Sequence, residues 1–272
     1  MSDAQVMVAK TDNAKGIFNM LSAIHLKKDI TAFCVMDRNG FRFTVEMHSA
    51  LQAHVYLKAD IFNDFRCQEK QQFGINLTLL LECLNIFGGS NNFVSLVIKY
   101  AGEGRPLLLE MSDAGVVSSS GLHTIDCGDP TDFMWGDSPL VNRVIMLCGP
   151  LRDMLGELDW WGSTLTLEMS KDSPNVRMTS KGDHGACCVE FPAHCEPFVK
   201  VECTSDTKED YRFQLLQSMY KGVSLSEKAC IRVNGNGMLS LQLMMRDGSN
   251  AEPTFVEFLV CADAPESMWD QV

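Results

Sequence analysis

Short runs in which apolar and polar residues alternate dominate the chain, and they predict β-strands. Successive side chains of a strand point to opposite faces, so an alternating run provides one face for a core. Turn residues separate the runs, and Asn39–Gly40 marks a hairpin. The runs lie at 32–36, 40–47, 51–58, 93–100, 106–111, 115–125, 165–170, 176–180, 186–191, 229–233, 238–245 and 255–261. The pattern predicts mostly antiparallel sheet.

Four segments instead repeat their apolar residues at the spacing of an α-helix. They begin at Asn13, at Asn76, after Pro150 and near residue 216. The apolar residues are Ala14, Ile17, Phe18, Leu21 and Ile24 in the first, Leu77, Leu80, Leu81, Leu84 and Phe87 in the second, Leu151, Met154, Leu155 and Leu158 in the third, and Leu215, Leu216, Met219 and Val223 in the fourth. Each predicted helix therefore has one apolar face that can pack against a sheet.

The order of these elements occurs twice along the chain. Each half reads strand, helix, strands, helix, strands, with a period of about 130 residues. A polar stretch rich in Asp, Gly and Pro, DCGDPTDFMWGDSP, separates the halves. The sequence therefore predicts an α+β protein with a first domain at 1–125, a connector at 126–139 and a second domain at 140–272.

The helix residues opposite the apolar stripes must face something other than the core. They are Lys15, Asn19 and Ser22 in the first helix, Thr78, Glu82 and Asn85 in the second, Arg152, Gly156 and Asp159 in the third, and Gln217, Lys221 and Ser224 in the fourth. Three of these sets contain a basic residue. Ordinary solvated faces and a surface that meets phosphates without reading bases are both consistent with the spacing.

Charge narrows the possible partners. The chain carries 23 basic and 35 acidic residues, a formal net charge of −12. Phosphate binding depends on Lys and Arg, so this balance argues against a protein that coats nucleic acid. A local basic surface is still possible, because the placement of the basic residues matters more than their total.

The eleven cysteines lack C-x-x-C spacing and several sit in apolar runs, so we interpret them as buried thiols in a reducing compartment. The densest group is His184, Cys187, Cys188, His194, Cys195 and Cys203. Tetrahedral zinc needs four such ligands, but neighbouring Cys187 and Cys188 on a strand point to opposite faces. We therefore do not predict zinc. No export signal or membrane segment is recognisable, so we expect neither export nor anchoring.

The sequence offers no recognisable active site. A nuclease needs clustered carboxylates to hold metal ions. The candidate acids are Asp37, Glu46, Glu110, Asp113, Glu157 and Asp159, and none forms a D-x-E or D-x-D pair on a convincing strand. A P-loop, a dinucleotide fingerprint, a nucleophile elbow and a zinc-protease motif are all missing from the sequence. These observations favour a binding or structural protein without a catalytic or metal site.

Several stretches together resemble the Rad-one family, one subunit of the heterotrimeric checkpoint clamp called the nine-one-one complex. They are DNAKGIFNMLSAIHLKKDITAFCVMDRNGFRFTVE, GINLTLLLECLNIFG, LRDMLGELD, GMLSLQLMMRDG and FVEFLVC. The chain is more remotely similar to the replication clamp, proliferating cell nuclear antigen. The resemblance covers nearly the whole chain in order, and it is looser in the connector and from Ser180 to Asp210.

The resemblance implies a ring of three different subunits around double-stranded DNA. Each subunit would have two similar sliding-clamp domains, with two helices per domain lining the hole and antiparallel sheets outside. The implied partners are Rad-nine-like and Hus-one-like subunits, a Rad-seventeen-containing clamp loader, and checkpoint and repair proteins. The implied location is the nucleus, without a membrane or cofactor, and family members are linked to the DNA-damage checkpoint, repair and meiosis.

The resemblance also assigns roles to residues. Lys15, Arg152 and Lys221 occupy hole-facing positions and become candidates for phosphate contact, and Lys10, Lys28 and Lys99 are candidates to reinforce that surface. Ring closure would use edge strands at Gly115–His123, beginning with Gly115, Val116, Val117 and Ser118, and at Asn175–Ser180, beginning with Asn175, Val176, Arg177 and Met178. Met36 and Ile125 would border a groove for client peptides, although this connector departs from the apolar pattern of the replication clamp.

Two other functions are alternatives to a DNA clamp. Members of the family have been assigned 3′-to-5′ exonuclease activity. The sequence contains no recognisable metal-binding cluster that would support this activity. The other rival is a β-rich module that binds only proteins.

Overall fold

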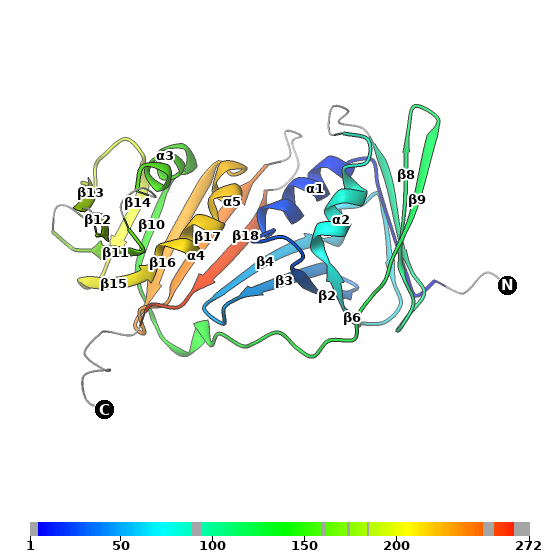
Figure 1. Cartoon of the computed structure of the whole chain (residues 1–272), viewed down its shortest axis with the longest axis horizontal. Coiled ribbons are helices and arrows are strands. Elements are labelled where there is room, and N and C mark those ends of the chain that lie inside the picture. Colours follow the sequence, from blue (N-terminus) through cyan, green and yellow to red (C-terminus); the bar gives the residue numbers. More distant parts are fainter. Residues whose placement is uncertain are drawn as a thin grey trace. The chain divides into compact units, whose positions relative to one another are not determined.

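The computed structural model describes residues 5–88, 94–158, 162–172, 175–183, 185–246 and 253–263 (Figure 1). The chain divides into two compact units. The first comprises Met1–Glu46, Ala53–Thr131 and Met245–Val256, and the second comprises Met47–Gln52, Asp132–Met244 and Glu257–Val272. The sequence-based boundaries, with a connector at 126–139, stay a prediction.

The first unit combines strands with two helices, and each strand is described with the unit that contains most of its residues. Its elements are β1 (Met7–Thr11), α1 (Ala14–Ala23), β2 (Thr31–Asp37), β3 (Gly40–Met47), β4 (Leu51–Lys58), a 3₁₀ turn (Ala59–Ile61), β5 (Asp64–Cys67), β6 (Gln71–Asn76), α2 (Leu77–Leu84), β7 (Ser95–Tyr100), β8 (Leu107–Asp113) and β9 (Val116–Leu122). One sheet has the strand order β5-β1-β7-β8-β9, and the other strands are neighbours in the order β4-β3-β2-β6. The predicted hairpin joins β2 to β3.

Helices α1 and α2 pack beside each other, as Figure 1 shows. Both begin with the same device, because the side chain of an asparagine accepts a hydrogen bond from a backbone N–H of the first turn. Asn13 Oδ1 accepts from Gly16 N at 2.9 Å, and Asn76 Oδ1 accepts from Leu79 N at 3.0 Å. The helix starts predicted at these two asparagines are confirmed.

The second unit has a similar set of elements. They are a 3₁₀ turn (Trp135–Asp137), β10 (Leu140–Leu147), α3 (Cys148–Leu158), β11 (Thr164–Met169), β12 (Val176–Gly182), β13 (Gly185–Phe191), β14 (Phe198–Cys203), β15 (Thr207–Arg212), α4 (Phe213–Ser218), α5 (Tyr220–Ser224), β16 (Lys228–Asn234), β17 (Leu239–Met245) and β18 (Thr254–Val260). One sheet has the order β13-β12-β11-β15, and the remaining strands follow the order β14-β10-β16-β17-β18.

The helix predicted near residue 216 is divided into α4 and α5 at Met219. Its second part lies very close to the sheet. A Cβ atom on Gly222 would come within 3.0 Å of Phe258 Cζ and 3.1 Å of Leu243 Cδ1, so a side chain does not fit there without a shift. The apolar residues Leu215, Leu216, Met219 and Val223 are buried as predicted.

Antiparallel pairing, with short helices packed on the sheets, confirms the predicted α+β class. Among the described residues, no helix has the length and apolar content needed to span a membrane.

Candidate nucleic-acid interface and subunit edges

The outward side of the first-unit helices is weakly charged. Lys15 on α1 is half-buried, and Lys28 is exposed in the loop that follows α1. That loop is attached to α2, because Thr78 Oγ1 lies 2.9 Å from His25 Nε2 and accepts a hydrogen bond from Asp29 N at 2.9 Å. Glu82 is exposed on α2, so the helices carry charges of both signs.

One residue expected on the outward side of α1 belongs to the core. Ser22 is 1% exposed, and its hydroxyl donates a hydrogen bond to Asn19 O at 2.9 Å. A serine can satisfy its hydroxyl within its own helix in this way, so a polar residue type alone did not identify the outward side. Ser22 is therefore buried, and its predicted place on the outward surface is wrong.

The second-unit helices present two candidate phosphate ligands. Arg152 lies on α3 with 42% of its side chain exposed, and its guanidinium bonds to Asp153 Oδ1 at 2.8 and 2.9 Å. Lys221 is exposed on α5, which packs beside α3. Two exposed acids of α3, Asp153 and Glu157, balance these two charges. Asp159, predicted on the same side, lies outside the described residues.

Lys10 and Lys99 do not lie on the helices. Both are on the outward face of the sheet formed by β5, β1, β7, β8 and β9, because their neighbours along the strands are buried. Lys99 Nζ contacts both carboxylate oxygens of Glu110 at 2.7 Å, and Lys10 Nζ is 3.7 Å from Asp64 Oδ2. Acids on the same sheet thus reduce the positive potential of both lysines.

Among the described residues, strand β9 forms one edge of its sheet and pairs with β8 alone. It joins β8 through a two-residue turn, Ala114–Gly115, in which both residues have positive φ, 47° and 85°. Gly115 is therefore part of the turn, and not of the strand as predicted. Val116 and Val117 are 61% and 68% exposed, and Ser118 is half-buried. An exposed edge of this kind can accept another strand.

The second edge expected from the sequence is wrong. Strand β12 pairs with β11 on one side and β13 on the other, so Asn175–Ser180 is interior to the sheet. Val176 and Met178 point into the core, at 1% and 4% exposed. Asn175 stabilises the preceding turn, because its amide nitrogen donates to Ser170 O at 3.1 Å and Lys171 O at 3.2 Å.

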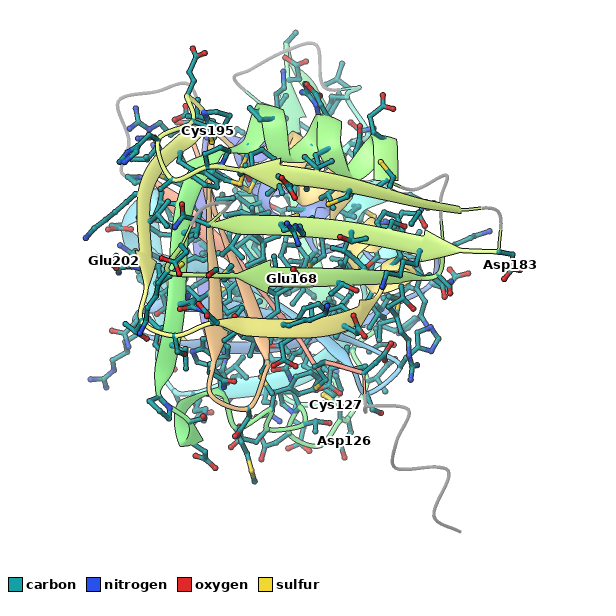
Figure 2. All side chains as sticks on the ribbon, turned by 90° about the vertical axis from the view of Figure 1, so that its left-hand side faces the viewer. Asp126, Cys127, Glu168, Asp183, Cys195 and Glu202 are labelled. Carbon is teal, nitrogen blue, oxygen red and sulfur yellow. The ribbon has the colours of Figure 1, made fainter. Side chains whose placement is uncertain are left out.

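The edge of this sheet is the next strand, β13. Its exposed residues are Gly185, Ala186, Cys188 and Glu190, with Cys187 and Val189 half-buried. Figure 2 looks onto the sheet, with Glu168 on β11 and Asp183 at the turn between β12 and β13. The sequence showed both strands, but their order in the sheet depends on pairings that alternation does not reveal.

The opposite edges of the same two sheets carry many charges. β5 has only four residues, and its Arg66 bonds to both carboxylate oxygens of Asp64 at 3.2 and 2.7 Å. In β15, four of six residues are charged: Lys208, Glu209, Asp210 and Arg212. Short and charged edge strands disfavour the addition of another strand.

Of the two residues predicted to border a client groove, one is buried and one is exposed. Met36 is completely buried, because it shares the core face of β2 with Ala32 and Cys34. It cannot border a surface groove in this structure. Ile125 is 52% exposed, and its N–H and carbonyl pair with Gly74 at 2.9 and 2.7 Å.

Two contacts fix parts of the predicted connector. The N–H of Thr131 donates to Glu46 Oε1 at 2.7 Å. Further along, the guanidinium of Arg232 stacks 5.5 Å from the ring centre of Trp135. Neither contact is indicated by the sequence pattern alone.

In the parts of the chain that the structure describes, no three His, Cys, Asp or Glu side chains are grouped to hold a metal ion. Of the cysteine–histidine group, Cys187 and Cys188 lie next to each other on β13, and His184 is outside the described residues. Burial raises the pKa of the Cys34 and Cys148 thiols, that of Cys148 to about 12, so both are protonated near neutral pH. A protonated thiol is a poor nucleophile and metal ligand.

Comparisons with known proteins identify a family, two relatives and a similar solved structure. Residues 6–245 match the family model described as "Repair protein Rad1/Rec1/Rad17". The chain is 34% identical over 271 residues to the cell cycle checkpoint protein RAD1 of Homo sapiens, which covers 97% of this chain and 95% of that protein. It is also 25% identical over 196 residues to the DNA repair exonuclease REC1 of Mycosarcoma maydis, covering 59% of this chain and 42% of that protein.

The fold is similar to that of a solved clamp. The crystal structure of proliferating cellular nuclear antigen from Entamoeba histolytica superposes with a TM-score of 0.80, over 96% of this chain and all of that chain. The sequences are 15% identical, so the likeness concerns the fold. The predicted clamp fold is confirmed.

Proposed function

Because the chain belongs to the Rad1 family of repair proteins, we propose that it is one subunit of a ring-shaped DNA clamp serving the damage checkpoint and DNA repair. The observation that carries this proposal is the combination of a Rad1-family sequence with a fold that matches a complete replication-clamp chain. Such a protein acts as a scaffold that holds DNA by enclosure.

The proposed ring contains three different subunits, with Rad9-like and Hus1-like chains as neighbours. The β9 edge and the β13 edge are the proposed contact strands, since each presents unpaired backbone groups with few charges. A Rad17-containing loader would place the ring on double-stranded DNA in the nucleus. Checkpoint, repair and meiotic proteins would then be recruited to it.

DNA would contact the helices of each unit through phosphates. Lys15, Arg152 and Lys221 are the principal candidates, and Lys28, in the loop that follows α1, is a further one. Lys10 and Lys99 contribute less, because they lie on strands of the sheet and not on the helices. Each phosphate contact makes log K fall by about 0.9 for each unit of log salt concentration. Because the candidate contacts are few, we expect a shallow salt dependence. Retention would then depend mainly on the closed ring.

The decisive experiment is co-expression with Rad9-like and Hus1-like subunits, followed by light scattering. We expect a 1:1:1 complex and a monomeric chain when it is expressed alone. The purified complex, loaded onto a nicked circular plasmid, should be retained in high salt and released when the plasmid is linearised. A monomer indifferent to both partners, or equal loss from circular and linear DNA, would contradict the proposal.

A 3′-to-5′ exonuclease is the second candidate, and the REC1 relative is the observation that favours it. It would require a metal site assembled from acids. Metal-dependent digestion of a 3′-labelled duplex by this chain, abolished by one pair of acid-to-amide substitutions that leave the fold intact, would establish it. Activity that separates from the protein during purification would not.

A further inference from the structure

A row of alternating charges crosses the outward face of the sheet that ends at β13. Glu190 on β13, Arg177 on β12, Glu168 on β11 and Lys208 on β15 are direct partners on neighbouring strands. The row therefore reads negative, positive, negative, positive from the β13 edge to the β15 edge. Glu168 is labelled at the centre of the sheet in Figure 2.

Each step in this row is an ion pair. Arg177 bonds to Glu190 Oε1 through Nε at 2.8 Å and Nη2 at 2.7 Å, and its Nη1 lies 3.3 Å from Glu168 Oε2. Lys208 Nζ lies 2.7 Å from Glu168 Oε1. Lys208 and then Arg177 hold the pKa of Glu168 below its usual value, so this carboxylate stays ionised at neutral pH.

The row stops with a negative charge at the edge proposed to accept a strand. The side chain of Glu190 is 48% exposed, and its neighbours on the same face of β13, Ala186 and Cys188, carry no charge. A strand that pairs with β13 would place one side chain directly opposite Glu190, with Cβ atoms about 5 Å apart. Opposite charges at such a position are favourable and like charges unfavourable.

The β9 edge of a second copy of this chain cannot provide that charge. Residues 116–122 read VVSSSGL and contain no Lys or Arg. A ring made of identical copies would therefore leave the alternation incomplete at every β13 contact.

Resting on the proposed function, we infer that the strand adding to β13 comes from a different polypeptide and places an Arg or Lys opposite Glu190. This side chain extends the row of alternating charges from one subunit into the next. Glu190 thereby selects the neighbour, because an acidic or neutral residue at that position forms a weaker contact.

The test uses the full-length chain assembled with its Rad9-like and Hus1-like partners, and it measures the affinity of each partner separately. Glu190→Lys should weaken binding of one partner by roughly ten-fold and leave the other unchanged. The matched control is Glu202→Lys, which reverses an ion-paired glutamate on β14, an edge strand of the other sheet. Exchanging one basic residue of the affected partner's edge strand for Glu should restore binding to Glu190→Lys.

Proline substitutions separate this inference from the proposed function. N–H groups alternate in direction along a strand, so one of Cys188 and Val189 points its N–H away from β12. The corresponding proline variant should keep the fold and block strand addition. If it abolishes assembly while Glu190→Lys assembles normally, charge selection is wrong and the β13 contact stands. If neither proline nor lysine affects assembly of a folded chain, β13 is not a contact strand and the proposed ring fails at this edge.

Discussion

The sheet that ends at β9 and the sheet that ends at β13 share a plan but differ in chemistry. Each has one charged edge, β5 or β15, and one edge with few charges. The β9 edge is neutral and presents two exposed valines, whereas the β13 edge ends a row of ion pairs at Glu190. If both edges bind neighbouring subunits as proposed, hydrophobic contact would dominate at the β9 edge and charge at the β13 edge, so the two edges would favour different partners.

Placing a charge on the neutral edge should produce the largest effect. Val117→Lys would bring an ammonium group into the proposed β9 contact, so we expect about a 100-fold loss of affinity for the partner bound there. Light scattering and partner titration measure the loss, and circular dichroism checks the fold. Val199→Lys is the control, because Val199 is 54% exposed on β14. Normal assembly of the Val117→Lys variant would exclude β9 as a contact strand.

The charged β15 edge should depend on contacts within its own unit. The Tyr211 hydroxyl is buried and donates a hydrogen bond to Gly237 O at 2.8 Å. Tyr211→Phe leaves that carbonyl without this donor, so the free energy of unfolding should fall by about 1–2 kcal/mol in urea denaturation. Tyr220→Phe, at a residue 41% exposed, should change it much less. Equal effects would mean that the hydrogen bond does not stabilise the edge.

Two glutamates on neighbouring strands should respond to pH in opposite directions. Lys208 and Arg177 lower the pKa of Glu168, so its stabilising contribution is present above the ordinary value of 4.5 and is lost as pH falls through the lowered pKa. Burial and Asp210 raise the pKa of Glu209, so its contribution is present below 4.5 and is lost as pH rises through the raised pKa.

Urea denaturation at pH 3 and pH 7 distinguishes these glutamates. At pH 7, Glu168→Gln should destabilise the unit by roughly 0.5 kcal/mol, after allowance for solvent screening. Glu209→Gln should stabilise it at pH 7. Both differences should shrink toward pH 3, and the same sign for both variants would contradict the assignment.

Salt should reveal the smallest difference between the edges. Raising the ionic strength from 0.1 to 1 M shortens the Debye length from about 10 to 3 Å and weakens exposed ion pairs. The partner at β13 should lose affinity roughly three-fold, while the partner at β9 should lose none. A parallel response of both partners in the same titration would remove the proposed chemical distinction.

The sequence predicted local structure better than tertiary neighbours. The helix starts at Asn13 and Asn76 could be located because apolar spacing and a capping residue coincide. β5 and β15 were missed because DFRC is short and TKEDYR is mostly charged, and neither resembles a half-buried strand. The alternation of Met36 with Ala32 and Cys34 predicts that Met36 is buried, whereas its placement at a groove came only from the family resemblance.

The row of charges could not be predicted for a different reason. Glu168 and Lys208 are forty positions apart, and they meet only because Met169 pairs with Thr207 and sets the register of β11 against β15. The predicted edge at Asn175–Ser180 was wrong for the same reason, because no local pattern indicates that β13 pairs with β12. Individual strands follow from local patterning, but edges and ion pairs follow from register.

The length of the tight turn at Ala114–Gly115 determines which side chains the β9 edge presents on each face. Side chains alternate between the two faces of a strand, so inserting one codon into this turn would exchange the faces on which Val117 and Ser118 project. The hairpin would still close, but a neighbouring subunit would meet a different pattern of methyl and hydroxyl groups. After gene duplication, two copies of such a clamp subunit can therefore diverge in partner choice through a change in turn length, with the rest of the coding sequence conserved.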